Sequence, residues 1–172
     1  MRNIDFTNYI QELPELLKNK NETVFVTSRE TCILQGDNGY NQIGGVPVYK
    51  THDFGGSIIN FKEDVCVCNY QPDFNDFGDN LMDTIANYLK SKGLNAERYG
   101  NDILVDGEYK VASYMSENTQ GCLYTAAHIS VGMDLELVKQ VCTKEMIKIP
   151  KGLKDYGITQ QEIINLIERE VV

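Results

Sequence analysis

The sequence predicts an α+β domain whose sheet is mixed and mainly antiparallel. Short β-type runs outnumber the helical stretches, and they cluster between predicted helices instead of alternating with them. A doubly wound parallel sheet requires that alternation, so it is disfavoured. The chain has 172 residues, 42% of them hydrophobic, with no internal repeat or linker. This length and apolar share suit one core, and we expect residues 1–172 to form a single domain.

Apolar residues at helical spacing predict four helices. The four stretches are 4–18, which contains Pro14, then 77–92, 134–141 and a last helix that opens at Thr159. Gly93 is placed to end the second helix. The last begins with Thr159 and carries Glu162 three residues on, which is the spacing of a capping box.

Runs rich in β-branched, aromatic and cysteine residues predict the strands between these helices. The predicted strands are 23–26, 32–34, 46–49, 57–61, 65–68, 96–99, 103–105, 109–115 and 122–131. We expect 57–61 and 65–68 to form a hairpin, because only the polar residues 62–64 separate them. Asp106-Gly107 predicts a tight turn between two later strands.

The charge balance excludes several classes of partner. The chain has 25 acidic and 16 basic residues, a formal net charge of −9. Such a protein repels polyphosphate at long range, so we expect no nucleic-acid or anionic-membrane partner. No apolar run approaches the length of a membrane helix, and the N-terminus lacks the apolar stretch of a secretory signal. We therefore expect a cytoplasmic protein.

The cysteines and one histidine are expected to be structural. Five cysteines are an odd number in a chain of this size, which favours free thiols in a reducing compartment. Cys66 and Cys68 face one side of a strand, but no second pair has the spacing of zinc ligands. His128 lies in an apolar strand and is expected to be a hydrogen-bonded residue of the core or of a pocket edge.

A first stretch with chemical potential surrounds a pair of glycines. Gly55 and Gly56 precede a strand, so the backbone there can approach a ligand closely, and the amides through Ser57 can face an anion. His52, just before them, could donate to a phosphate or lie solvated in a turn. For the Gly-Gly pair taken alone, a glycine turn that enters a hairpin is the better explanation.

A second stretch places three polar groups around the Asp106-Gly107 turn. Asn101 and Asp102 precede one strand and Lys110 begins the next, so a hairpin brings them close together. A carboxamide, a carboxylate and an ammonium at one place could hold a metal-bound phosphate and a ligand carboxylate. From spacing alone, a surface hairpin with a solvated lysine is the better explanation.

Together the two stretches resemble the catalytic domain of lipoate–protein ligases, in the superfamily shared with biotin–protein ligases and octanoyltransferases. Residues 48–59 look like the family's basic strand and Gly-Gly-Gly-Ala loop. Residues 101–113 resemble its Asn-Asp-Leu, strand, glycine turn and Lys-Ile-Ser-Gly element. Residues 127–135 are similar to its apolar strand running into Asp-Leu, and 151–159 to its Lys-Gly-Val-Lys segment. The resemblance covers residues 31–170 in the family's order.

The resemblance implies an ATP-dependent reaction in two steps. The carboxylate of lipoate or a related acid attacks the α-phosphate of ATP, and a lysine of a lipoyl acceptor protein domain then takes the acyl group. Lys110 would be the catalytic residue beside the ligand carboxylate. Asn101 and Asp102 would face the nucleotide and Mg²⁺, with Asp102 reaching the metal through the nucleotide. His52 and the amides of residues 55–57 would line the groove for ligand and nucleotide.

The chain also departs from the family pattern. Lys50-Thr51 replace the Arg-Arg before the glycine loop, and Phe54 replaces the first glycine. Ser113 replaces the glycine after the lysine, and Gly100 replaces the arginine before Asn-Asp. We expect the family's C-terminal accessory domain to be absent. The alternatives are a non-catalytic binder of ligand or adenylate, and a member that requires a separate accessory domain.

A cysteine-dependent octanoyl or lipoyl transferase is a further alternative. Octanoyltransferases of this fold use a cysteine nucleophile with a lysine, and Cys142 lies where one subgroup places it. That subgroup has Pro-Cys-Gly, whereas Val141 and Thr143 flank Cys142 here. Lys139 and Lys144 could lower the pKa of the thiol. They belong to a basic cluster, completed by Lys148, Lys151 and Lys154, that could meet ATP phosphates or an acidic acceptor domain.

Overall fold

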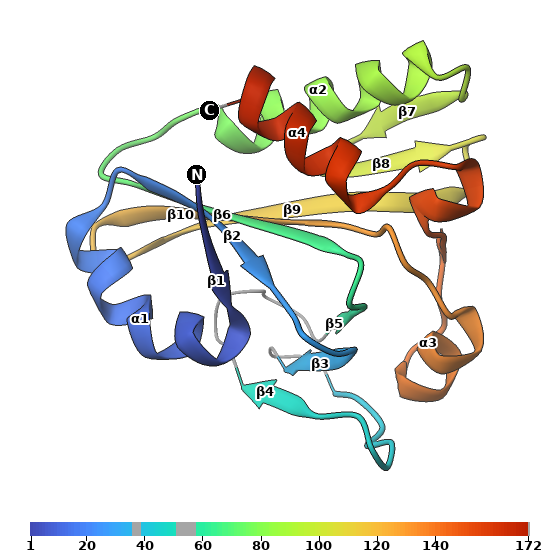
Figure 1. The fold of residues 1–172 in the computed structure, drawn as a ribbon, viewed down its shortest axis with the longest axis horizontal. Helices are drawn as coiled ribbons and strands as arrows, with labels where there is room; N and C mark the ends of the chain where they lie inside the picture. The colour runs from blue at the N-terminus through green and yellow to red at the C-terminus, as the bar shows by residue number, and fades with distance from the viewer. Residues whose placement is uncertain (36–38, 51–57, 172) are drawn as a thin grey trace.

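The computed structural model describes residues 1–35, 39–50 and 58–171 (Figure 1). His52, Gly55, Gly56 and Ser57, the predicted groove residues of the glycine loop, lie outside the described residues. The helices are α1 (Phe6–Asn19), α2 (Phe77–Ser91), α3 (Leu135–Val141) and α4 (Gln160–Glu170), with a 3-10 turn at Leu153–Tyr156. The strands are β1 (Arg2–Asp5), β2 (Glu22–Thr27), β3 (Cys32–Gln35), β4 (Val48–Lys50), β5 (Ile58–Asn60), β6 (Val65–Gln71), β7 (Ala96–Tyr99), β8 (Asp102–Val105), β9 (Tyr109–Thr119), β10 (Cys122–Ile129) and β11 (Ile149–Pro150).

The strands form two sheets, as the mixed α+β prediction requires. The large sheet has the order β1-β2-β6-β10-β9-β8-β7, with β11 beside β9, and the small sheet has the order β4-β3-β5. Most neighbours are antiparallel, whereas β1–β2, β9–β11 and β3–β4 are parallel. The predicted fold class is therefore confirmed.

Local signals placed most helices correctly. The capping box at Thr159 is formed, since its side chain accepts from the Glu162 amide and the Glu162 carboxylate accepts from the Thr159 amide. The first helix continues through Pro14, but it begins only after Asp5, whose carboxylate caps it by accepting from the Asn8 amide at 3.0 Å. The residues before it form β1, a strand too short for its periodicity to be distinguished from that of the helix.

The hairpin predicted for 57–61 and 65–68 is wrong. β5 pairs with β3 in the small sheet, and β6 lies in the large sheet between β2 and β10. Asp64 fixes the turn between them, because its carboxylate accepts from the amides of Phe61, Val131 and Gly132 at 2.8–3.1 Å. The chain therefore crosses from one sheet to the other at this turn instead of folding back on itself.

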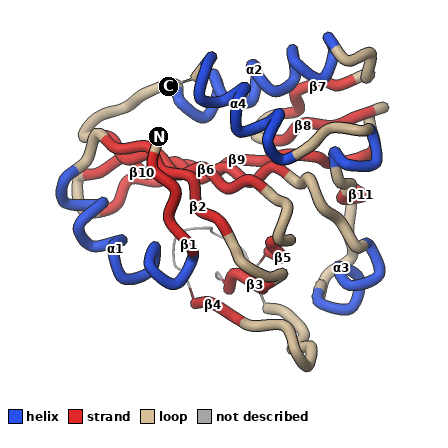
Figure 2. Tube along the Cα trace, viewed as in Figure 1, coloured by secondary structure: helices blue, strands red, loops and turns tan. Residues whose placement is uncertain are grey.

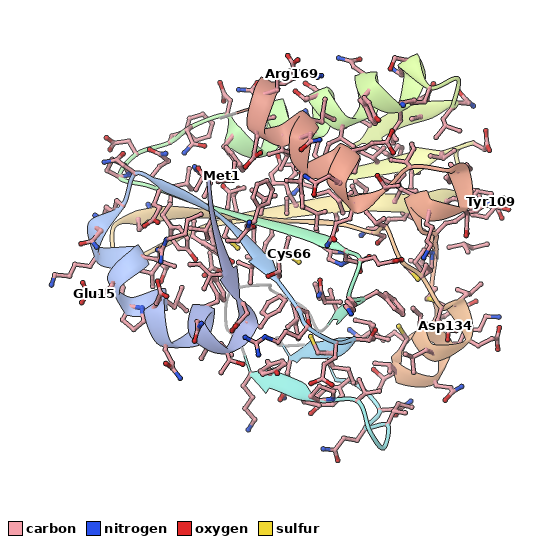
Figure 3. All side chains as sticks on the ribbon, viewed as in Figure 1. Met1, Glu15, Cys66, Tyr109, Asp134 and Arg169 are labelled. Carbon is pink, nitrogen blue, oxygen red and sulfur yellow. The ribbon has the colours of Figure 1, made fainter. Side chains whose placement is uncertain are left out.

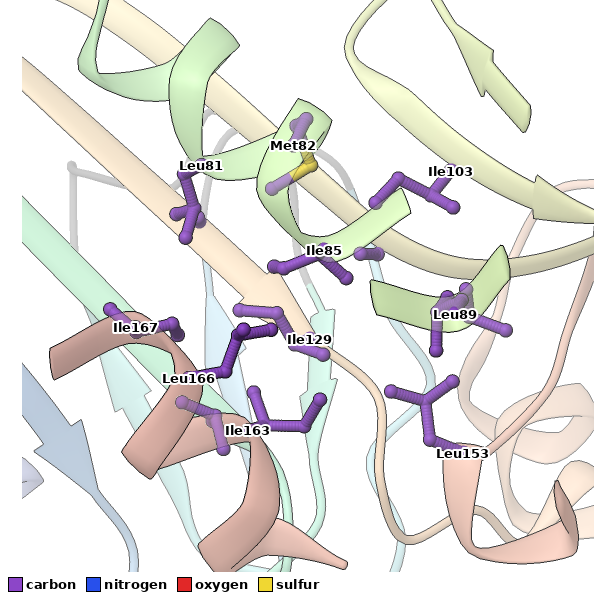
Figure 4. Close-up of a cluster of buried hydrophobic side chains, with 14 of the residues drawn as sticks. Leu81, Met82, Ile85, Leu89, Ile103, Ile129, Leu153, Ile163, Leu166 and Ile167 are labelled. Carbon is purple, nitrogen blue, oxygen red and sulfur yellow. The ribbon is translucent and has the colours of Figure 1, made fainter. Parts of the chain in front are cut away.

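Helices cover the two faces of the large sheet unequally. Figures 1 and 2 show α2 and α4 together on one face, and α1, the small sheet and α3 on the other. The main core lies under α2 and α4, where side chains of these helices pack against sheet residues that include Ile103 and Ile129 (Figure 4). A second cluster joins α1, the small sheet and the opposite sheet face. Among the described residues, no helix is long and apolar enough to cross a membrane.

Candidate functional site

The structure brings Asp102 and Lys110 together, with a third residue, Lys148. The Lys110 Nζ atom lies 2.9 Å from Asp102 Oδ1, and Lys148 Nζ lies 2.6 Å from Asp102 Oδ2. Lys148 comes from the segment between α3 and β11, and its ammonium also stands over the Tyr99 ring, 4.9 Å from the centroid. Sequence reasoning had placed Lys148 only in a general basic cluster. We name Lys110, Asp102 and Lys148 the lysine–aspartate cluster.

A register shift between β8 and β9 places Lys110 on the same face of the sheet as Asp102. Asp102 lies opposite Ser113 and Ile103 opposite Ala112, but Leu104 lies opposite Lys110, so Val111 is an extra residue in β9. One extra residue reverses which face the following side chains occupy. Without it Lys110 would point into the core under α2 and α4. The tight turn predicted at Asp106-Gly107 closes this hairpin, and both residues have positive φ angles (56° and 70°).

The lysine–aspartate cluster carries excess positive charge. Burial would raise the pKa of Asp102, but hydrogen bonds from Lys148 and Lys110 outweigh that effect, so the pKa lies below its usual value. The carboxylate is therefore ionised at neutral pH and faces two ammonium groups. One negative group between two positive ones leaves a local field that attracts anions such as a carboxylate or a phosphate.

Asn101 lies in the turn that leads into this cluster. It is exposed, and its backbone carbonyl accepts from the Tyr114 amide at 3.0 Å, which ties the turn to β9. Gly100, before it, has a φ of +62°, a left-handed conformation that an arginine would adopt only with strain. The departure from the family pattern at this position thus has a backbone reason in this chain.

His128 lies on the same sheet face as the lysine–aspartate cluster. It pairs in register with Ser113, which in turn pairs with Asp102. Its neighbours Ala127 and Ile129 point into the core under α2 and α4, so His128 points to the opposite face. Its Nε2 lies 2.9 Å from Asp64 Oδ2, and its side chain is 14% exposed. The prediction of a hydrogen-bonded histidine at the edge of the core is confirmed.

Beyond His128 the same row becomes fully buried. Cys66 is its register partner on β6, and the thiol donates to Asn60 Oδ1 at a distance of 3.0 Å. Burial raises the pKa of the Cys66 thiol well above its usual value. Figure 3 shows Cys66 in the interior of the molecule, on β6, which lies between β2 and β10 in the large sheet.

Comparisons with known proteins point to one fold. No protein-family model matches the sequence, and no curated protein matches it. Among solved structures, P. falciparum LipL1 in complex with lipoate is 18% identical with a TM-score of 0.73, over 98% of this chain and 60% of that one. A bi-partite lipoate protein ligase from Thermoplasma acidophilum, studied with its E2 lipoyl domain, is 14% identical with a TM-score of 0.73, over 98% and 80%. Lipoate-protein ligase A bound with ATP is 14% identical with a TM-score of 0.72, over 98% and 81%.

The fold is that of the lipoate–protein ligase catalytic domain. The likeness is one of architecture, because the identities are low, and the chain spans only 60% of the Plasmodium protein. Within this fold, the lysine–aspartate cluster lies at the β8–β9 hairpin. His128 lies further along the same sheet face, where it pairs with Asp64 from the β5–β6 turn. Asp64 had no sequence signal beyond its place in a polar turn.

Lys139, one of the two lysines predicted to lower the pKa of Cys142, has another partner in the structure. Cys142 lies at the C-terminal end of α3, and partial desolvation raises the pKa of its exposed thiol, the reverse of what a nucleophile needs. Lys139 is bound instead to Glu136, at 2.8 Å. The role of Cys142 as a nucleophile stays a prediction.

The other cysteines behave as predicted. All five are free, and four are buried; these are Cys32, Cys66, Cys68 and Cys122. Over the described part of the chain, no group of three or more histidine, cysteine or acidic side chains could hold a metal ion on its own. Cys66 and Cys68 are fully buried in the second core cluster, as predicted for residues that pack in the core.

Proposed function

We propose that this protein activates a lipoate-type carboxylic acid with ATP and transfers the acyl group to a lysine of a lipoyl acceptor domain. The observation that carries the proposal is the lysine–aspartate cluster, which concentrates positive charge on one sheet face of a lipoate-ligase fold. Neighbours of this fold have been seen with lipoate and with ATP, ligands that carry a carboxylate and phosphates.

In the first step a carboxylate oxygen of the acid attacks the α-phosphorus of ATP. The bond to the leaving pyrophosphate breaks, and pyrophosphate takes the electron pair. The Lys110 ammonium lies within reach of the acid carboxylate and stabilises the charge that develops around it. Lys148 supplies a second cation on the phosphate side.

Asp102 and Asn101 offer the oxygen donors that Mg²⁺ prefers. One carboxylate and one carboxamide suit a metal that a nucleotide brings and that phosphates and water largely coordinate, since no described cluster could hold it alone. When bound, the metal would neutralise charge on the phosphates. The same two residues would orient the nucleotide beside Lys110.

In the second step the neutral amine of the acceptor lysine attacks the acyl carbonyl carbon. The carbon–oxygen bond to the phosphate breaks, AMP leaves with the electron pair, and the amine proton passes to solvent. Lys110 then faces the oxygen on which negative charge develops. The same side chain would thus serve both steps.

Mass spectrometry of a lipoyl domain incubated with the protein, ATP and lipoate tests this proposal. We expect one acyl group on the acceptor lysine, and its loss in Lys110→Ala. Lys18→Ala is the matched control, because Lys18 lies exposed on α1, away from the cluster. Acylation that survives Lys110→Ala would contradict the role given to Lys110.

A second candidate is a ligase domain that works only with a separate partner. It is favoured by the similarity to a Thermoplasma ligase described as bi-partite. Acylation that appears only after a candidate accessory domain is added would support it. Binding of lipoate without acylation, with or without that domain, would favour a non-catalytic binder.

A further inference from the structure

Two exposed apolar side chains flank Lys148 of the lysine–aspartate cluster. Ile147, the preceding residue, is 97% exposed, and Tyr99, whose ring lies under the Lys148 ammonium, is 68% exposed. In the part of the chain that the structure describes, the other large hydrophobic side chains that are exposed are Met1 and Phe74. A single exposed apolar side chain needs no explanation, but two beside one charged site are typical of a surface that a partner covers.

The backbone holds both side chains at one edge of the large sheet. Tyr99 is opposite Asp102 in the pairing of β7 with β8, so both point to the same sheet face, and β7 is the last strand of the sheet. Ile147 lies between Met146, which packs against the buried cluster of α3 and the small sheet, and Lys148, which contacts Asp102. Consecutive Cα atoms are about 3.8 Å apart, so Ile147 borders the lysine–aspartate cluster. We name Ile147 and Tyr99 the apolar rim.

The apolar rim borders a basic segment of an otherwise acidic chain. Residues 144–151 contain three lysines and one acidic residue, whereas the whole chain has a net charge of −9. Lys110 and Lys148 share the single carboxylate of Asp102. The Lys151 ammonium lies over two tyrosine rings, which do not neutralise it. The chain as a whole therefore repels an acidic partner while this segment attracts it, which steers an encounter to the rim.

We infer that the apolar rim docks the lipoyl acceptor domain, and that this partner carries acidic side chains beside its lysine. The inference rests on the proposed function and specifies the surface used in its second step. Docking at Ile147 and Tyr99 brings the acceptor lysine towards Lys110, where the acyl group is activated. Apolar contact with Ile147 contributes affinity, and the basic segment orients the partner.

Acyl transfer from preformed lipoyl-adenylate to a lipoyl domain measures the second step alone. We expect Ile147→Asp to raise KM for the lipoyl domain about tenfold, because an apolar contact is lost and a negative charge then faces an acidic partner. Ile147→Leu keeps the apolar contact and should stay close to the wild type. The wild-type kcat/KM should also fall as salt is added, and it should fall when the acidic residues around the acceptor lysine are replaced by their amides.

Phe74→Asp is the matched control. Phe74 is 84% exposed and lies in the loop between β6 and α2, which Figure 2 shows at the other end of the large sheet from β11. The same change of charge and of apolar surface there should leave KM for the lipoyl domain unaltered. ATP–pyrophosphate exchange with lipoate needs no acceptor, so it should be equal in the wild type and in all three variants, which also shows that they are folded.

The outcomes separate this inference from the proposed function. An unchanged KM in Ile147→Asp would overturn the docking surface and leave the ligase proposal standing. Loss of exchange in Ile147→Asp would place Ile147 against the acid or the nucleotide, and a dimer that this variant dissociates would place a second copy on the rim; either result overturns the inference. If the wild type shows no exchange with any acid, the ligase proposal fails. Calorimetric binding of the lipoyl domain that Ile147→Asp weakens and Phe74→Asp does not would then still support the surface, and equal or absent binding would overturn it.

Discussion

Replacing Lys148 by alanine should destabilise the protein at neutral pH and much less in acid. The mutation removes the 2.6 Å contact to Asp102, whose side chain is 17% exposed, and a charge-assisted hydrogen bond of this kind contributes about 1 to 2 kcal/mol when both partners are largely covered. Lys148→Met keeps the packing over Tyr99 and should lose nearly as much, which separates the ion pair from the ring contact.

The pH dependence follows from the lowered pKa of Asp102. Burial opposes the lowering, but hydrogen bonds from Lys148 and Lys110 dominate, so the folded protein holds this proton less tightly than the unfolded chain. The stabilisation is complete above the unfolded value of about 3.9 and is lost as the pH falls through the lower folded value. The difference between wild type and Lys148→Ala should therefore shrink in strong acid.

Urea unfolding at pH 7 and at the lowest pH where both proteins still fold measures this difference. Lys18→Ala removes only a 3.9 Å contact between two exposed side chains and should change stability little at either pH. A loss in Lys148→Ala that is the same at both values, or no loss at neutral pH, would refute the assignment of the ion pair.

Three further predictions concern other parts of the chain. Asp64→Asn should lower the free energy of unfolding in urea by about 3 kcal/mol, because an amide nitrogen would replace one acceptor oxygen of a fully buried carboxylate that faces three backbone amides and His128. A loss below about 1 kcal/mol would contradict the role of Asp64 in fixing this turn. The pKa of Glu162 is lowered to about 2, first by the backbone amide of Thr159 and then by Lys92, so the stability it provides should fall as the pH drops from about 4.5 towards 2; Glu162→Gln should remove that part of the acid profile, and an unchanged profile would argue against it. Cys142→Ser should leave ATP-dependent exchange unchanged, whereas loss of an ATP-independent acyl transfer would instead favour the cysteine transferase.

Features encoded by neighbouring residues were predictable from the sequence. Helix α2 follows from its apolar spacing, and helix α4 follows from its apolar spacing and the Thr159 capping box. The Asp106-Gly107 turn also predicts the hairpin that brings Asp102 near Lys110, because two left-handed residues in succession favour a tight turn between antiparallel strands.

Features set by distant parts of the chain were not predictable. The extra residue at Val111, which turns Lys110 towards Asp102, depends on the pairing of β8 with β9 and has no composition of its own. The separation of β5 from β6 depends on amides near Val131 that reach Asp64 only in the folded state. Lys148 approaches Asp102 across 46 residues of sequence, so its place in the site emerges only from the fold.

ATP–pyrophosphate exchange with lipoate, octanoate and biotin supplied separately tests the central claim most directly. Activation of an acid by ATP predicts exchange that depends on at least one of these acids and disappears in Lys110→Ala, while Lys18→Ala keeps it. Exchange that is unaffected by Lys110→Ala, or its absence with every acid even after an accessory domain is added, would contradict the account.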